Sequence, residues 1–404
     1  MNARRRTDSK PLPKAIVMAC RGGAQGDLGV VRTLGRAGVP VSVLAEYADA
    51  PASQSRYCRE LHLADNFARE REATLAKLLE LAGAESEAPV VFPTADPDLR
   101  MLSDCRDSLE PHCRLFLSER HIVESCLDKS RFHDFVAQFD VPVPATRVPA
   151  DRSEALAAAG ELRYPVILKP AKPDSWNDPR ITEIVAGKKA VVAHDPDQLL
   201  SFYDRIVPFG NELVLQEYIP GRDDRLYSLH AYISRTGEPL ALFTGQKIRT
   251  WPTYAGIGCF VRSVYVPEIV ESGTRLLRDM GYTGVALLQF KRDERDGVFK
   301  LLEINPRASS WNLLAYACGV NIPYAAYSDV VGLPADPMTR QREGVRYIYF
   351  GHDRKAFMDY RRHGDCSWSD WLRSLVGRNV YQYFASDDPG PWMTLLKQKL
   401  HARF

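Results

Sequence analysis

Three polar side chains at alternate positions of one strand-like segment form the clearest chemical signal in the sequence. Residues 301–307 read Leu-Leu-Glu-Ile-Asn-Pro-Arg, so Glu303, Asn305 and Arg307 are separated by single apolar residues. Successive side chains of a β-strand point to opposite faces, which places these three on one side of a sheet. Carboxylate and amide oxygens suit Mg²⁺, and a guanidinium can hold phosphoryl oxygens in a bidentate way. The segment therefore predicts a magnesium–triphosphate site, and a solvated hairpin with a polar outer face is the alternative.

The preceding segment adds a third candidate metal ligand, Gln289. Residues 285–305 predict an antiparallel hairpin whose polar turn is centred near Arg295. This centring places Gln289 opposite Leu301 and diagonal to Glu303, on the same face of the sheet. A slip of one residue would move the glutamine to the other face, so the prediction depends on the register.

Three further segments carry polar residues that suit a nucleotide. Cys126-Leu-Asp-Lys129 ends in a lysine, Tyr164-Pro-Val-Ile-Leu-Lys169 is a strand that ends in another, and Leu215-Gln-Glu-Tyr-Ile219 reads as a strand end. Each alone is also compatible with an ordinary exposed surface. Taken in this order with residues 301–307, they resemble the motifs of the ATP-grasp superfamily, and the resemblance covers about residues 15–335.

The resemblance implies an α/β protein with the ATP-grasp fold, in which two α+β subdomains clasp ATP after a Rossmann-like domain. It implies ATP and Mg²⁺ as cofactors, with Mn²⁺ as an alternative metal. The implied metal ligands are Gln289, Glu303 and Asn305. The implied nucleotide-binding residues are Lys129, Lys169, Gln216, Glu217, Tyr218, Ile219 and Asp223. The implied catalytic residues are Arg307, Lys247 and Arg249.

Two features depart from the ATP-grasp pattern. Residues 171–180, expected over the phosphates, contain no glycine, so Lys172, Ser175 or Arg180 is expected to replace contacts that bare backbone amides usually make. The metal position often held by an acidic residue is Gln289, a neutral oxygen ligand that predicts weaker magnesium binding.

Residues 247–258 combine two basic residues with a glycine-containing loop, which bears on the class of reaction. Lys247 and Arg249 precede a loop with Gly256 and Gly258, which resembles the substrate-covering loop of uncharacterised carboxylate–amine ligases of the superfamily. An ordinary basic hairpin is the alternative. The predicted function is formation of an amide or peptide bond through an acyl phosphate. The alternatives are a phosphotransferase with a small-molecule acceptor and a catalytically weak ATP-binding regulatory protein, and the sequence identifies neither the acid nor the amine.

The elements that must position these residues follow from apolar runs and turn signals. Residues 14–20, 26–37 and 39–44 predict a β-α-β start, and 121–139 predict one amphipathic helix. The predicted domains are a Rossmann-like domain over residues 1–120, an ATP-grasp domain over 121–335 with its small subdomain at about 165–220, and a helical extension over 336–404. The resemblance assigns substrate binding to the first domain, where Thr94 and Asp96 follow a strand.

Composition excludes several classes of protein. In 404 residues, 53 Lys and Arg against 51 Asp and Glu give a net charge of +2, which gives no reason to expect nucleic acid as a partner. The eight cysteines include no Cys-x-x-Cys pair, which argues against a structural zinc and for a reduced, cytoplasmic protein. No apolar run is long enough for a membrane span. The expected partners are a small carboxylate and a small amine, and a homodimer is also considered.

Overall fold

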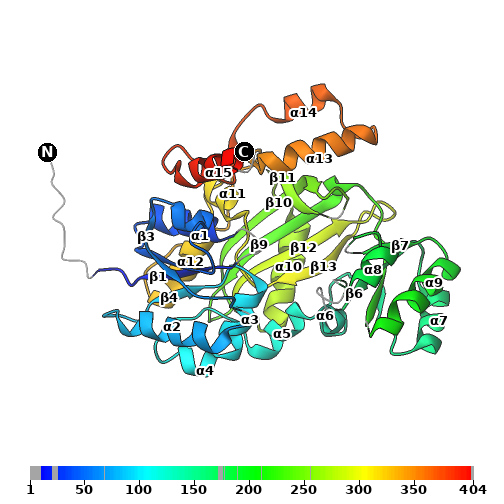
Figure 1. The fold of residues 1–404 in the computed structure, drawn as a ribbon, viewed down its shortest axis with the longest axis horizontal. Helices are drawn as coiled ribbons and strands as arrows, with labels where there is room; N and C mark the ends of the chain where they lie inside the picture. Colours follow the sequence, from blue (N-terminus) through cyan, green and yellow to red (C-terminus); the bar gives the residue numbers. More distant parts are fainter. Residues whose placement is uncertain are drawn as a thin grey trace.

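The computed structural model describes residues 11–20, 26–67, 69–171, 176, 178–188, 190–210, 212–254 and 256–401. Within these residues the strands form three sheets of four, seven and four strands (Figure 1). The predicted phosphate-loop residues Lys172 and Ser175 lie outside the described residues.

The first sheet is built from the amino-terminal part of the chain. Its four parallel strands lie in the order β3-β2-β1-β4, which are Cys58–Leu63, Val41–Ala45, Ala15–Ala19 and Val90–Phe92. The accompanying helices are α1 Asp27–Arg36, α2 Arg71–Gly83, α3 Asp96–Asp104 and α4 Arg106–Leu109, with the short η1 at Pro51–Gln54. The predicted β-α-β start is confirmed because β1 and β2 are fully buried apolar runs that flank α1. Strand β3 was not predicted, since most of its side chains are exposed and it contains no buried apolar run.

The predicted single helix over residues 121–139 is wrong. The structure has two helices there, α5 Arg120–Leu127 and α6 Lys129–Val136, separated by Asp128. The backbone of Asp128 is extended, and its carboxylate accepts a hydrogen bond from the Ser130 amide at 2.9 Å. Aspartate is a strong N-cap residue, so it begins a new helix and places Lys129 at the first position of α6.

The small sheet is antiparallel and has the order β5-β8-β6-β7. Its strands are Thr146–Arg147, Leu213–Glu217, Val166–Pro170 and Val191–Ala193. The helices around it are α7 Arg152–Glu161, α8 Pro179–Ile184 and α9 Pro196–Ile206, followed by η3 Val207–Phe209. Lys169 on β6 pairs with Val214 on β8, so the second predicted lysine and the predicted hinge come from neighbouring strands.

The large sheet has the order β13-β12-β9-β10-β11-β14-β15. Its central strands are β9 Leu226–Ile233, β10 Pro239–Trp251, β11 Ile257–Ser263, β12 Gly284–Arg292 and β13 Phe299–Asn305, with η4 at Asp223–Arg225. The associated helices are α10 Pro267–Asp279, α11 Asn312–Ala317 and α12 Ile322–Val331. One hydrophobic core contains buried residues of β1, α12 and β10, which fixes the first sheet against the large one.

The carboxyl-terminal region is helical, as predicted, with α13 Phe350–Arg362, α14 Trp368–Ser374 and α15 Gly390–His401. It also contains two strands that were not predicted, β14 Arg346–Ile348 and β15 Asn379–Tyr381, which extend the large sheet beyond β11. Three-residue strands carry too little periodicity to be recognised in a sequence. The predicted domain boundaries near residues 120 and 335 stay predictions.

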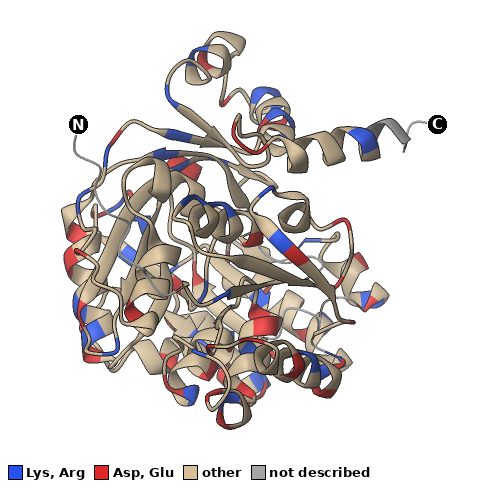
Figure 2. Cartoon of the chain, turned by 90° about the vertical axis from the view of Figure 1, so that its left-hand side faces the viewer, with Lys and Arg blue, Asp and Glu red and all other residues tan. Residues whose placement is uncertain are grey.

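A buried ion pair joins this region to the first sheet. Arg32 of α1 donates from Nε to Asp388 Oδ2 at 2.8 Å, and both side chains are at most 1% exposed. Basic and acidic residues are interspersed along the chain in the view of Figure 2, in keeping with the balanced charge of the sequence. Of the described helices, none has the length and apolarity needed to cross a membrane.

Candidate active site

The predicted metal ligands share one face of the large sheet. Strand β12 pairs with β13 so that Gln289 lies directly opposite Glu303, and Leu287 lies opposite Asn305. The predicted pairing of Gln289 with Leu301 is therefore wrong. A register shift after Gln289 pairs Leu301 with Phe290 instead. The face was predicted correctly, since directly opposed residues in an antiparallel pair point to the same side.

A chain of hydrogen bonds runs through these residues. Lys247 Nζ donates to Gln289 Oε1 at 2.9 Å, and Gln289 Nε2 donates to Glu303 Oε1 at 2.5 Å. Asn305 Nδ2 donates to the same oxygen at 3.0 Å, and Arg307 donates to Asn305 Oδ1 at 3.3 Å. Both amide groups thus turn a donor toward the single carboxylate.

This donor set fits a hard divalent cation. Glu303 supplies one carboxylate, and Gln289 and Asn305 supply two amide oxygens from the same sheet face. Rotation of the two amide groups by half a turn would present oxygens in place of the NH₂ groups that now meet Glu303. Oxygen ligands of this kind suit Mg²⁺. Among these three side chains Glu303 is the one carboxylate, and the predicted weaker magnesium binding stays a prediction.

Lys247 lies at the centre of the site and is buried. Burial lowers its pKa, against the opposing effect of the Glu303 and Asp223 charges. Beside it, burial and the Lys247 charge lower the pKa of His230 to about 3, so this imidazole is neutral. Its Nδ1 lies 3.2 Å from the Ser309 hydroxyl, and its ring stacks on Trp311. His230 was not predicted, because an isolated histidine in an apolar strand gives no functional signal.

The two predicted nucleotide lysines come together. Burial and then the Lys129 charge lower the pKa of Lys169 to about 8, while Glu303 acts in the opposite direction. Lys169 Nζ donates to Gln216 Oε1 at 3.1 Å. The amide of Gln216 also contacts His133 Nε2 at 2.8 Å, which fixes its orientation. Lys129 and Lys169 therefore form a local positive charge that would suit polyphosphate.

The side chain of Glu217, predicted to bind adenine at the hinge, forms ion pairs within the chain. Its carboxylate forms ion pairs with Arg295 at 2.7 Å and Lys300 at 3.5 Å, and Arg295 also pairs with the buried Asp293. The hinge of the small sheet is thus fixed to the turn of the β12–β13 hairpin. An adenine contact through the Glu217 side chain would have to share its carboxylate with these two cations, and the Tyr218 amide already donates to the Pro165 carbonyl at 2.9 Å.

The carboxylate of Asp223, predicted to bind the ribose, also has partners within the chain. It is 4% exposed, and its Oδ2 accepts hydrogen bonds from Thr250 Oγ1 at 2.6 Å, the Tyr254 amide at 2.9 Å and the Tyr360 hydroxyl. These donors come from β10, the following loop and α13. Lys291, two residues after Gln289 on β12, has its Nζ 4.8 Å from the ring centre of Tyr218.

The predicted catalytic Arg249 sits in a different environment from Lys247. Its guanidinium pairs with the fully buried Asp353 of α13 at 2.6 Å and lies over the Phe260 ring at 4.1 Å. Arg180, predicted as a phosphate contact, pairs with Asp178 at 2.6 Å. Both arginines therefore have structural partners, and a role at the phosphates would require each to leave its carboxylate.

Arg307 connects the sheet face that carries Glu303 and Asn305 to helix α3 of the first domain. Besides Asn305, its guanidinium contacts Asp96 at the start of α3. Nearby, burial raises the pKa of Asp98 to about 7, although the Thr94 and Ala95 amides donate to its carboxylate. The start of α3 thus places two carboxyl groups, those of Asp96 and Asp98, near Arg307.

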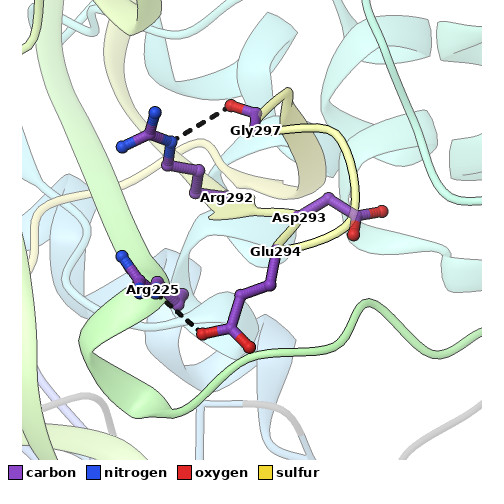
Figure 3. A pocket seen from close by; sticks show the side chains of 5 residues that line it. All are labelled: Arg225, Arg292, Asp293, Glu294 and Gly297. Carbon is purple, nitrogen blue, oxygen red and sulfur yellow. Dashed lines mark hydrogen bonds and ion pairs between the residues drawn. The ribbon is translucent and has the colours of Figure 1, made fainter.

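A pocket of about 530 Å³ lies at the tip of the β12–β13 hairpin (Figure 3). Its lining residues are Arg225, Arg292, Asp293, Glu294 and Gly297. Arg225 pairs with Glu294 at 2.9 Å, and Arg292 donates to the Gly297 carbonyl at 3.1 Å. The lining of the pocket includes Asp293, the partner of Arg295, and none of Gln289, Glu303 and Asn305.

Comparison with solved structures identifies the fold of this chain. The biotin carboxylase domain of Hydrogenobacter thermophilus 2-oxoglutarate carboxylase superposes with a TM-score of 0.63 at 17% identity, covering 84% of this chain and 74% of that one. N5-carboxyaminoimidazole ribonucleotide synthetase from Thermus thermophilus gives 0.59 at 17% identity, covering 81% of each. Both have the ATP-grasp fold, and this chain has the same fold.

Sequence comparison narrows the resemblance. Residues 261–352 match a family described as ATP-grasp in the biosynthetic pathway with Ter operon. D-aspartate ligase of Enterococcus faecium is 24% identical over 308 residues, which are 73% of this chain and 72% of the ligase. The carbamoyl phosphate synthase large chain of Methanothermobacter thermautotrophicus is 24% identical over 236 residues, 55% of this chain and 21% of that protein. The chain is thus similar to ATP-dependent enzymes that form carbon–nitrogen bonds.

Proposed function

We propose that this chain is a Mg-ATP-dependent ligase that joins a small carboxylic acid to an amine. The observation that carries the proposal is the shared sheet face on which Lys247, Gln289, Glu303 and Asn305 form one hydrogen-bonded chain. The similarity to D-aspartate ligase and carbamoyl phosphate synthase supports the same reaction class.

The reaction would proceed in two displacements. A carboxylate oxygen of the acid attacks the γ-phosphorus of ATP, and the bond to the β-phosphate oxygen breaks, giving an acyl phosphate and ADP. The amine nitrogen then attacks the acyl carbon, inorganic phosphate leaves, and the nitrogen loses a proton. Positioning and charge neutralisation are the main requirements of such phosphoryl transfer.

The residues of the chain would divide this work. Lys129 and Lys169 would hold the phosphates, and Lys247 would neutralise charge where the carboxylate meets the γ-phosphate. Gln289, Glu303 and Asn305 would hold Mg²⁺, which would supply neutralising positive charge for the phosphates when bound. Arg307, at the junction with the first sheet, would hold the acyl phosphate and the oxyanion formed during amine attack.

Isotope transfer tests this function. The chain is incubated with Mg-ATP and a panel of acids labelled with ¹⁸O in the carboxylate, each with a panel of amines. A ligase transfers one ¹⁸O atom from the acid to inorganic phosphate and forms an amide. A phosphorylated acceptor without an amide would instead identify a phosphotransferase, and nucleotide binding without turnover would identify the weak ATP-binding protein that the neutral Gln289 also suits.

The same assay tests the metal face. Glu303→Gln keeps the size of the side chain and removes the one carboxylate of the donor set, so turnover is expected to fall at least about 100-fold by loss of charge stabilisation. Glu119→Gln, an exposed carboxylate at the start of α5, is the matched control. Equal turnover in the two variants would reject the metal assignment.

The cellular location and the oligomeric state of the chain are also proposals. All eight cysteines are free, which supports the predicted cytoplasmic location. The predicted homodimer has support from the biotin carboxylase relative, which is described as a domain dimer. Light scattering on the purified chain would decide the oligomeric state.

A further inference from the structure

The Asp223 carboxylate joins three parts of the chain that are far apart in sequence. Asp223 lies in η4, directly after the hinge of the small sheet. Its Oδ2 accepts from Thr250 Oγ1 at 2.6 Å and from the Tyr254 amide at 2.9 Å, at the end of β10 and in the loop that follows. The third donor is the hydroxyl of Tyr360 on α13. Thr250 and Tyr360 are 0% and 5% exposed, so the junction is a buried one.

Tyr360 also holds the backbone of β10. The Thr250 amide donates to the Tyr360 hydroxyl oxygen at 3.2 Å, so this hydroxyl accepts from the strand and donates to Asp223. A hydrogen bond to a charged group in a buried site is among the stronger ones in a protein. The loop and the acidic residue are therefore positioned by the same side chain.

Further contacts fix the loop to the carboxyl-terminal region. The Tyr254 hydroxyl donates to Asp365 at 2.5 Å, and Thr253 donates to Asp359 of α13. Tyr254 has φ +67, a conformation that a bulky side chain adopts only when its surroundings enforce it. The backbone amide of this residue is the one bound to Asp223, so the strained conformation and the junction depend on each other.

The junction lies next to the candidate active site. Lys247 is three residues before Thr250 on β10, and Lys291 lies beside the hinge residue Tyr218. The Asp223 charge acts on both lysines, since it opposes the lowering of their pKa by burial. All three hydrogen bonds described above end on Oδ2 of Asp223. Figure 1 shows α13 lying over the end of β10 and β11.

We infer that Tyr360 of α13 is a positioning residue of the nucleotide site. It holds Asp223 and residues 251–254 in place, so that nucleotide binding at the hinge is coupled to this loop and to the carboxyl-terminal region. The inference rests on the proposed function in one respect, namely that Mg-ATP binds at the hinge. It adds that the region after residue 350, which contributes none of the predicted ligands, belongs to the working site.

The test replaces Tyr360 with phenylalanine, which keeps the ring and removes the hydroxyl. The matched control is Tyr232→Phe, because Tyr232 is also buried and donates to a carboxylate, that of Asp329, at 2.7 Å. Three quantities are measured for each variant and the unmodified chain: the midpoint of thermal unfolding, the Kd for Mg-ADP, and hydrogen exchange of residues 251–254 with and without Mg-ADP.

We expect Tyr360→Phe to raise the Kd for Mg-ADP about threefold to tenfold, in line with loss of one hydrogen bond to a charged group. Exchange of residues 251–254 should become faster, and its slowing by Mg-ADP should disappear. Tyr232→Phe should lower the unfolding midpoint by a similar amount and leave the Kd and the loop unchanged.

The inference fails if Mg-ADP binds but the two variants give the same Kd and the same exchange of residues 251–254. It also fails if Mg-ADP leaves the exchange of this loop unchanged in the unmodified chain. Normal binding and coupling without any amide product would instead reject the proposed ligase reaction and leave the inference standing, so the two failures are distinguishable.

Discussion

Gln289 lies directly opposite Glu303 in the β12–β13 pair, and its side-chain amide donates to the glutamate carboxylate at 2.5 Å while accepting from Lys247 at 2.9 Å. A neutral residue at this position removes the repulsion that two facing carboxylates would have. It also removes one negative charge from the metal site. A glutamine at position 289 should therefore stabilise the metal-free chain and weaken the proposed binding of Mg²⁺, and a glutamate there should do the reverse.

Gln289→Glu should shift this balance. Like charges directly opposite each other in a sheet destabilise it, so the unfolding midpoint should fall in the presence of a chelator and recover with millimolar Mg²⁺. The Mg²⁺ concentration for half-maximal turnover should fall about tenfold, because a carboxylate is a stronger ligand than an amide. Gln138→Glu, an exposed substitution of the same charge, should show neither effect. Thermal unfolding and magnesium titration measure both, and a stability change that magnesium does not reverse would contradict the prediction.

Lys169 predicts a pH-dependent nucleotide affinity. Its pKa of about 8 in the folded chain means that its charge is present below that pH and is lost above it. The Kd for Mg-ADP should therefore rise between pH 7.5 and 9.5, with proton uptake on binding near pH 8.5. Lys169→Met should weaken binding and remove most of this slope, whereas Lys77→Met should do neither. Calorimetry in buffers of different ionisation enthalpy measures the proton uptake.

The same shift has the opposite effect on stability. In the unfolded chain a lysine has a pKa of about 10.4, so the unfolded state binds more protons than the folded state between pH 8 and that value. The Lys169 contribution to the free energy of unfolding should therefore increase with pH in this window. Comparing the unfolded fraction of the unmodified chain and Lys169→Met across the window isolates it, and a decrease with pH would contradict the assignment.

Arg249 should behave as a structural residue. Breaking its buried pair with Asp353 leaves an uncompensated charge, so Arg249→Met should lower the free energy of unfolding by about 3 kcal/mol. The double variant with Asp353→Leu should recover much of that loss. Denaturant unfolding of the two single variants and the double variant gives the coupling energy. A large fall in kcat with unchanged stability would instead support the catalytic role that the sequence suggested.

Arg307 should act on catalysis and not on nucleotide binding. Replacing it with lysine removes the bidentate guanidinium from the junction between the magnesium face and Asp96. We expect kcat to fall about 100-fold, as when one transition-state donor is lost, with the Kd for Mg-ADP unchanged. Arg59→Lys on the exposed strand β3 is the control. Equal losses of kcat and affinity would assign Arg307 to the nucleotide.

The sequence alone determined that Gln289, Glu303 and Asn305 share one face of the sheet, and it determined the order of the proposed nucleotide motifs. The alternation of Glu303 and Asn305 and the short hairpin place Gln289 on their side with few alternatives, because a strand has a period of two. The family resemblance implied that Lys129 and Lys169 belong to one nucleotide site, and in the structure the Lys129 charge lowers the pKa of Lys169. Even here the exact pairing was missed, since the register shift after Gln289 leaves no trace in the hydrophobic pattern.

Only the tertiary structure decided the partners of the remaining site residues. Arg249, Glu217 and Asp223 have the residue types of a nucleotide site, yet each is bound by a group distant in sequence, namely Asp353, Arg295 and Tyr360. Such contacts depend on how the carboxyl-terminal region and the hairpin turn pack against the sheet, which local periodicity does not encode. A buried charge takes whatever counter-charge the packing brings within a few ångströms, because leaving it unpaired costs several kilocalories per mole.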